Sequence, residues 1–233
     1  MRNLFIFAFV FVAGYAPAQD LHQELDAMGQ YLNGLDAYRL DVAYRTSGDT
    51  SGLFNTQGQA SVYATSAGLF YQTEFANLII NQSHTFVVNA AEKSIIYSHN
   101  SPVPKGAPFL RDQLLLGVDS LIAQADSVYF SQSGDQRIYH LRLPGQYIDL
   151  LELAFSGKFL EKVTYFYNPA YTDGVTGLQA SCIVQVDEHP IFDPQLLSSS
   201  FYIIPAGGDT YQPAAHFAGY FLTYNASLEE ITH

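Results

Sequence analysis

Histidine and cysteine, the residue types most often used as transition-metal ligands, are few in this chain and widely spaced. No two histidines stand at the H-x-H or H-x-x-x-H spacing that brings two imidazoles to one side of a strand or helix. Potential ligands gather only in the VDEHP stretch of residues 186–190, which is typical of a solvated turn at a strand end. The sequence therefore predicts no metal site and no cofactor. The seven histidines are at positions 22, 84, 99, 140, 189, 216 and 233.

Nucleophiles in a catalytic setting are equally hard to find. The single cysteine, Cys182, alternates with apolar residues in LQASCIVQV, and no basic residue flanks it. We therefore expect a thiol on the core side of a strand, with no intramolecular disulfide in the chain. No G-x-S-x-G motif is present, and no glycine-rich loop opens a helix after a strand. The pattern thus predicts no enzyme and names no catalytic residue.

The composition favours a chain with a large apolar core and an acidic surface. Hydrophobic residues make up 48%, with 17 Tyr and 17 Phe. The 22 acidic residues outnumber the 10 basic residues, and the formal net charge is −12. A nucleic-acid partner is therefore excluded, because phosphate binding requires basic patches. Anionic lipid headgroups would be repelled as well, so contact with lipid would go through acyl chains.

Residues 1–18 have the pattern of a signal peptide. Arg2 precedes an apolar run from Leu4 to Val12, and Ala16-Pro17-Ala18 has the small-x-small pattern that signal peptidase cleaves. The run is well short of the ~20 apolar residues of a spanning helix, which argues against the alternative of a retained anchor. We expect an exported protein that is cleaved near Ala18, with no lipid on its new N-terminus because no cysteine follows.

Two amphipathic helices are predicted in the remaining chain. The first covers residues 20–35, where apolar residues recur at steps of four and three, and Asn33-Gly34 ends it. The second covers about 108–124, with Pro108 in its first turn. The stripe of the first helix consists of Leu21, Leu25, Met28, Leu32 and Leu35.

Short strands with brief polar connections make up most of the rest. In NLIINQSHTFVVNAAEKSIIY, three apolar triplets put apolar side chains on both faces of a sheet. One reading is that the two helices cover the second face and that a lipid displaces them; the other is that Phe and Tyr side chains fill it permanently. We predict a mainly β protein: a strongly curved antiparallel sheet in a single domain, residues 19–233, with 205–233 as an extension that the pattern does not assign.

The order of signal peptide, amphipathic helix, meander, leucine-rich helix and second meander resembles the LolA-like family of periplasmic lipoprotein carriers. The resemblance covers roughly residues 20–204. It is carried by LDAYRLDVAYR, by residues 58–97, by FLEKVTYFY and by IFDPQLLSSSFYIIP. The Arg-Pro pair that precedes a Leu-Phe-aromatic strand in proteobacterial carriers, whose Arg bonds to the lid, is replaced here by Thr65-Ser66-Ala67-Gly68, and their Trp is Tyr71.

This resemblance implies an incomplete β-barrel covered by two or more helices. It also implies a periplasmic, monomeric carrier that binds acyl chains of lipoproteins or related lipids and shuttles them toward the outer membrane. Inner- and outer-membrane lipoprotein-handling proteins are the further partners to expect. The alternative is a non-enzymatic envelope sensor or protein-interaction module with the same fold. The predicted apolar cavity is lined by Leu69, Tyr71, Phe75, Ile79, Phe86, Val88, Ile96, Leu114 and Leu121.

Overall fold

The computed structural model describes residues 16–48, 56–99, 118–208 and 210–225. They divide into two compact units, each assembled from separate parts of the chain. Unit 1 takes residues from 1–34, 42–58 and 108–185, and unit 2 takes residues from 35–41, 59–107 and 186–233. Among the described helices, none is both long enough and apolar enough to pass through a lipid bilayer.

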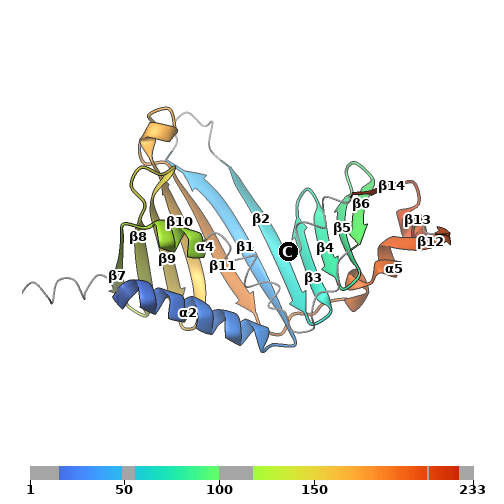
Figure 1. Cartoon of the computed structure of the whole chain (residues 1–233), viewed down its shortest axis with the longest axis horizontal. Coiled ribbons are helices and arrows are strands. Elements are labelled where there is room, and N and C mark those ends of the chain that lie inside the picture. Colours follow the sequence, from blue (N-terminus) through green and yellow to red (C-terminus); the bar gives the residue numbers. More distant parts are fainter. Residues whose placement is uncertain (1–15, 49–55, 100–117, 209, 226–233) are drawn as a thin grey trace, which may run out of the picture. The chain divides into compact units, whose positions relative to one another are not determined.

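Most described residues lie in strands, and twelve strands form one sheet (Figure 1). Its order is β14-β6-β5-β4-β3-β2-β1-β11-β10-β9-β8-β7, which is open and has β14 and β7 as its edges. Both predicted meanders are confirmed by this order. The bounds are β1 Ala37–Ser47, β2 Gln57–Thr65, β3 Gly68–Thr73, β4 Asn77–Asn81, β5 His84–Asn89, β6 Ser94–His99, β7 Ser127–Ser133, β8 Gln136–Arg142, β9 Ile148–Ser156, β10 Phe159–Tyr167, β11 Gln179–Asp187 and β14 Phe221–Tyr224.

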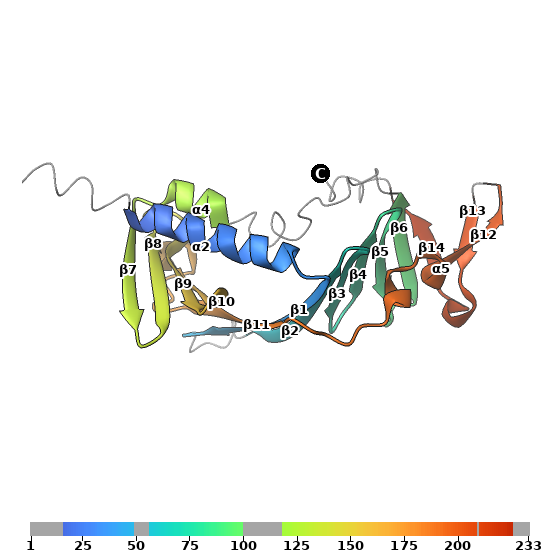
Figure 2. The same ribbon diagram turned by 90° about the horizontal axis from the view of Figure 1, so that it is seen from below.

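In unit 1 two helices pack on one side of β7–β10, as Figures 1 and 2 show. Helix α2 spans Ala16–Asn33, and its stripe is confirmed, since Leu21 and Leu25 are 0% and 2% exposed. Of the predicted helix 108–124, residues 108–117 lie outside the described residues, and Val118–Gln124 forms α4. The two helices share a core cluster with Tyr139, Leu153 and Phe155 of the strands beneath them.

The end of α2 differs in mechanism from the sequence-based expectation. The backbone N–H of Gly34 donates to the carbonyls of Gln30 and Tyr31, at 3.1 and 3.0 Å, so the helix stops at Asn33 as the Asn-Gly pair predicts. Gly34 is nevertheless absent from the described residues with positive φ. A left-handed glycine therefore does not end this helix; the tight last turn does.

In unit 2 the meander β2–β6 pairs consecutive strands in antiparallel register. The turn into β3 requires glycine at position 68. Gly68 has φ +150°, and a Cβ there would lie 2.2 Å from the carbonyl oxygen of Ile80. No other residue type fits so close to the neighbouring strand.

The C-terminal part of unit 2 adds short elements to this meander. They are η2 Pro194–Leu197, α5 Ser199–Tyr202, β12 Ile203–Gly207, β13 Thr210–Pro213 and η3 Ala215–Phe217. The predicted helical turn and final strand of PIFDPQLLSSSFYIIP are thus confirmed. The extension that the sequence did not assign contributes β14, which pairs with β6 in parallel, Phe221 opposite Ser94 and Tyr224 opposite Tyr97.

Candidate functional site

The strands β3–β6 have two apolar faces, as the triplets of the sequence predict. Directly opposed residues point to the same side of a sheet, so the register assigns each side chain to a face. We call them the Phe86 face and the Ile96 face. The Phe86 face consists of Phe70, Ile79, Phe86, Val88, Ile95 and Tyr97, and the Ile96 face of Leu69, Tyr71, Leu78, Ile80, Val87 and Ile96.

The Phe86 face is covered by the C-terminal residues of the same unit. Phe86 stacks on Tyr202 with ring centroids 4.9 Å apart, and Leu197 and Ile203 are buried in the same cluster. Hydrogen bonds fix this cover: the amide of Asn81 donates to the carbonyl of Leu197 at 2.9 Å. A face with 0% exposed Phe86 and Ile79 is ordinary core.

The Ile96 face differs, because part of it remains accessible. Tyr71, Leu78, Val87 and Ile96 are directly opposed in successive strand pairs and are all half-buried. Val62 of β2 lies opposite Tyr71 and continues the apolar row, but it is buried, at 3% exposed. Neighbouring strands are about 4.8 Å apart, so the four half-buried side chains form a continuous apolar row about 14 Å long, enough to lie along much of an acyl chain.

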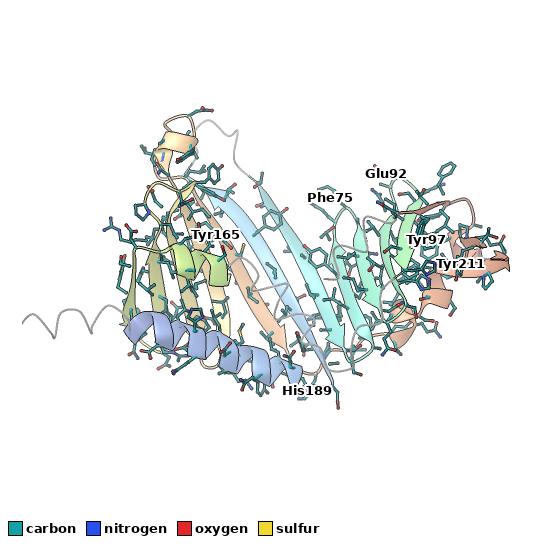
Figure 3. The ribbon with its side chains drawn as sticks, viewed as in Figure 1. Phe75, Glu92, Tyr97, Tyr165, His189 and Tyr211 are labelled. Carbon is teal, nitrogen blue, oxygen red and sulfur yellow. The ribbon has the colours of Figure 1, made fainter. Side chains whose placement is uncertain are left out.

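The nine residues predicted to line one cavity do not share one surface. Ile79, Phe86 and Val88 lie on the Phe86 face, in the core, whereas Leu69, Tyr71 and Ile96 lie on the Ile96 face. Phe75 is in the turn after β3 and 70% exposed (Figure 3). Leu121 packs against the unit 1 core, and Leu114 lies outside the described residues.

Two members of the row, Leu78 and Val87, were missed from sequence. Strand alternation could have found them, because residues two apart share a face and Leu78 must join Ile80, not Ile79. The prediction chose residues by their apolar character in each triplet and did not separate the two faces.

In unit 1 a polar network fastens α2 to β8. Glu24 receives two hydrogen bonds from the Arg137 guanidinium, at 2.8 and 3.0 Å, and one from the Tyr139 hydroxyl at 2.9 Å. The hydrogen bond to Glu24 raises the pKa of Arg137. Burial, and next the bond to Glu24, raise the pKa of Tyr139. This network attaches the helix to the sheet of unit 1.

On strands β7–β9, a serine, a histidine and a glutamate form a chain of two hydrogen bonds. The amino-acid sequence did not indicate this arrangement. His140 Nε2 is 2.8 Å from the Ser131 hydroxyl, and His140 Nδ1 is 3.0 Å from a Glu152 carboxylate oxygen. This order of groups is the one used in nucleophilic catalysis. Acyl transfer also needs donors aimed at the oxyanion. Strand N–H groups lie in the plane of the sheet, whereas the Ser131 side chain stands perpendicular to it. The strands around Ser131 therefore do not direct N–H groups at an oxyanion that would form above the sheet beside its hydroxyl.

Cys182 of β11 lies opposite Val163 and packs against the unit 1 core. The thiol is half-buried, and burial raises its pKa. A thiol held in its protonated form is a poor nucleophile at neutral pH.

No family model matches the chain, and no curated protein matches it. Among solved structures, an uncharacterized conserved protein from Thermus thermophilus is 11% identical with a TM-score of 0.48, over 88% of this chain and 99% of that one. The Mycobacterium tuberculosis lipoprotein LppX is 13% identical with a TM-score of 0.36, over 73% and 93%. LprF from Mycobacterium bovis is 8% identical with a TM-score of 0.34, over 72% and 93%.

Proposed function

We propose that this protein is an exported, non-enzymatic carrier that binds acyl chains of lipoproteins or related lipids on the Ile96 face and shuttles them toward the outer membrane. The observation that carries the proposal is the half-buried row of Tyr71, Leu78, Val87 and Ile96. The opposite face of these strands is already covered by the chain's own C-terminal residues. An apolar row of this length with room for contact fits an elongated apolar ligand.

The energetics suit a carrier that must also release its cargo. Burying a methylene gains about 0.8 kcal/mol, so a sixteen-carbon chain gains on the order of 12 kcal/mol in a closed cavity. A chain lying on one face buries roughly half of its surface and gains on the order of 6 kcal/mol. That corresponds to a dissociation constant on the order of 10 to 100 µM, before the cost of ordering the chain. The charge of the protein also favours binding through the acyl chain, because a net charge of −12 disfavours contact with anionic headgroups.

The test is binding of a fluorescent fatty acid to the delipidated protein, with two isoleucine variants compared. Ile96→Asn puts an amide at the β6 end of the row, directly beside Val87, and should weaken binding about tenfold. Ile191→Asn is the matched control, since Ile191 is 99% exposed and outside the row, and should bind as the parent does. Absence of saturable binding to the parent protein, or equal affinity in both variants, would contradict the proposal.

Identification of the cargo and a test of export both require protein purified from its own cell envelope. Native mass spectrometry should show a bound lipid or lipopeptide, and the polypeptide mass should correspond to a chain that begins near Gln19. A protein that carries a tightly associated polypeptide and no lipid would instead support the alternative of an envelope sensor.

A further inference from the structure

Two histidines 15 residues apart in sequence are brought together at one end of unit 2. His84 of β5 and His99 of β6 are directly opposed in the strand register, and their ring centroids are 4.8 Å apart. Three tyrosines surround the pair. Tyr211 contacts both imidazoles, at 5.9 and 6.0 Å, and lies beside Tyr97 in Figure 3. Tyr224 of β14 contacts His99 at 5.8 Å.

One nitrogen of His84 is fixed by its neighbours. The Ser199 hydroxyl lies 2.9 Å from Nδ1 of His84, and the Asn81 amide donates to the same hydroxyl at 3.1 Å. Asn81 in turn is held by the backbone N–H groups of Ser83 and His84. The imidazole therefore has a set orientation, like a metal-bound histidine whose second nitrogen is hydrogen-bonded to an oxygen.

The other nitrogen of His84 has no hydrogen-bond partner among the residues that the structure describes. Nε2 is completely buried, in a residue that is only 8% exposed. Buried polar atoms are nearly always paired, so an unpaired nitrogen in an imidazole that lies directly beside a second imidazole calls for a ligand. In the tautomer whose Nδ1–H donates to the Ser199 hydroxyl, the lone pair of the neutral His84 imidazole is on Nε2.

We propose that His84, through Nε2, and His99 bind a divalent transition metal ion of the kind that imidazole prefers, with Cu²⁺ the strongest candidate. Water and a tyrosine oxygen would complete the coordination. In the described part of the chain no group of three or more His, Cys, Asp or Glu side chains gathers, so the protein supplies two nitrogen ligands. The acidic chain also raises the local concentration of cations. The spacing rules applied to the sequence missed this pair, because they require histidines close together in the chain. The two histidines are brought together by the register of β5 and β6.

The experiment is a Cu²⁺ titration of the delipidated protein, without a histidine tag, by calorimetry and electron paramagnetic resonance. We expect one ion per chain and a spectrum with two imidazole nitrogens. His99→Ala should lower the affinity at least tenfold, and His99 is exposed, so the fold should survive the change. His189→Ala, at an exposed turn outside the pair, is the matched control and should bind as the parent does.

Three outcomes would overturn the site: no Cu²⁺ bound, a spectrum with fewer than two imidazole nitrogens, or unchanged affinity in His99→Ala. His84→Ala also removes the contact with Ser199, so its loss of binding counts only if its circular dichroism matches the parent. Fatty-acid binding measured on His99→Ala separates the two ideas, because the metal pair is not part of the Ile96 row and that binding should be unchanged.

Discussion

Glu24 of α2 and Arg137 of β8 form a two-point ion pair, with both carboxylate oxygens bonded to guanidinium nitrogens at 2.8 and 3.0 Å. The side chains are 22% and 31% exposed, so the pair is partly shielded from water. Arg137 also donates to the carbonyl of Gly157 at 2.6 Å. Three parts of unit 1, a helix, a strand and a hairpin turn, are thereby joined through one guanidinium.

Glu24→Gln should destabilise unit 1. The amide keeps the shape of the carboxylate but removes its charge and one of its acceptor atoms, so we expect a loss of about 1–2 kcal/mol in the free energy of unfolding by urea. Glu161→Gln is the control, because Glu161 is exposed and accepts a single long hydrogen bond from the Gln136 amide, at 3.2 Å. This change should alter stability by less than about 0.5 kcal/mol. Equal effects of the two variants would show that the ion pair is not an attachment point.

Phe86→Ala should be among the most damaging single changes in unit 2. The ring is 0% exposed and stacked on Tyr202, so its removal leaves a cavity and costs about 3–5 kcal/mol. Phe221→Ala removes the same ring at a position that is 76% exposed and should cost far less. Urea midpoints at constant m-value measure both, and a small effect of Phe86→Ala would mean that the C-terminal cover is not part of the folded core.

Stability should fall on acidification in a window set by His84. Its pKa is about 4 in the folded protein and about 6.5 in an unfolded chain, so the unfolded state binds more protons between these values. The contribution of the neutral His84 imidazole to the free energy of unfolding is present above pH 6.5. It is lost as the pH falls toward 4, which lowers the free energy of unfolding by on the order of 2–3 kcal/mol. His84→Asn should flatten the dependence of unfolding free energy on pH relative to the parent. The same slope in both proteins would contradict burial of a neutral imidazole.

Ser131 should not act as a nucleophile, despite its hydrogen bond to His140. We expect p-nitrophenyl esters to be hydrolysed at equal, background rates by the parent protein and by Ser131→Ala. Mass spectrometry after treatment with a fluorophosphonate should find Ser131 unmodified. A burst that releases p-nitrophenol at a concentration equal to that of the protein, and that is abolished in Ser131→Ala, would refute the non-enzymatic proposal.

Local patterns in the sequence were enough to predict helix α2 and the strands of the two meanders. The stripe of Leu21 and Leu25 predicted α2, and the triplets and polar turns predicted the strands β4–β6, because these signals depend on residues close in the chain. The two apolar faces were also predictable from Ile79 and Ile80 standing side by side.

Pairings between distant residues could not be predicted in the same way. The cover of the Phe86 face comes from Leu197 and Tyr202, more than a hundred residues after Ile79, and local periodicity does not report such contacts. The histidine pair depends on which residue of β6 lies opposite His84, and that register is set by the turn between the strands. The cavity prediction failed for a different reason: it chose residues by apolar character and did not apply the alternation of side chains along each strand, which is a local pattern.

The parallel pairing of β14 with β6 has a consequence for how the chain matures. During synthesis, residues 57–99 emerge from the ribosome well before residues 194–224, which supply their cover and their last neighbouring strand. Until β7–β11 have been synthesised, the Phe86 face of unit 2 therefore stays uncovered and the edge of β6 stays unpaired. Ribosome-stalled chains ending before residue 194 should therefore aggregate, whereas full-length chains should not.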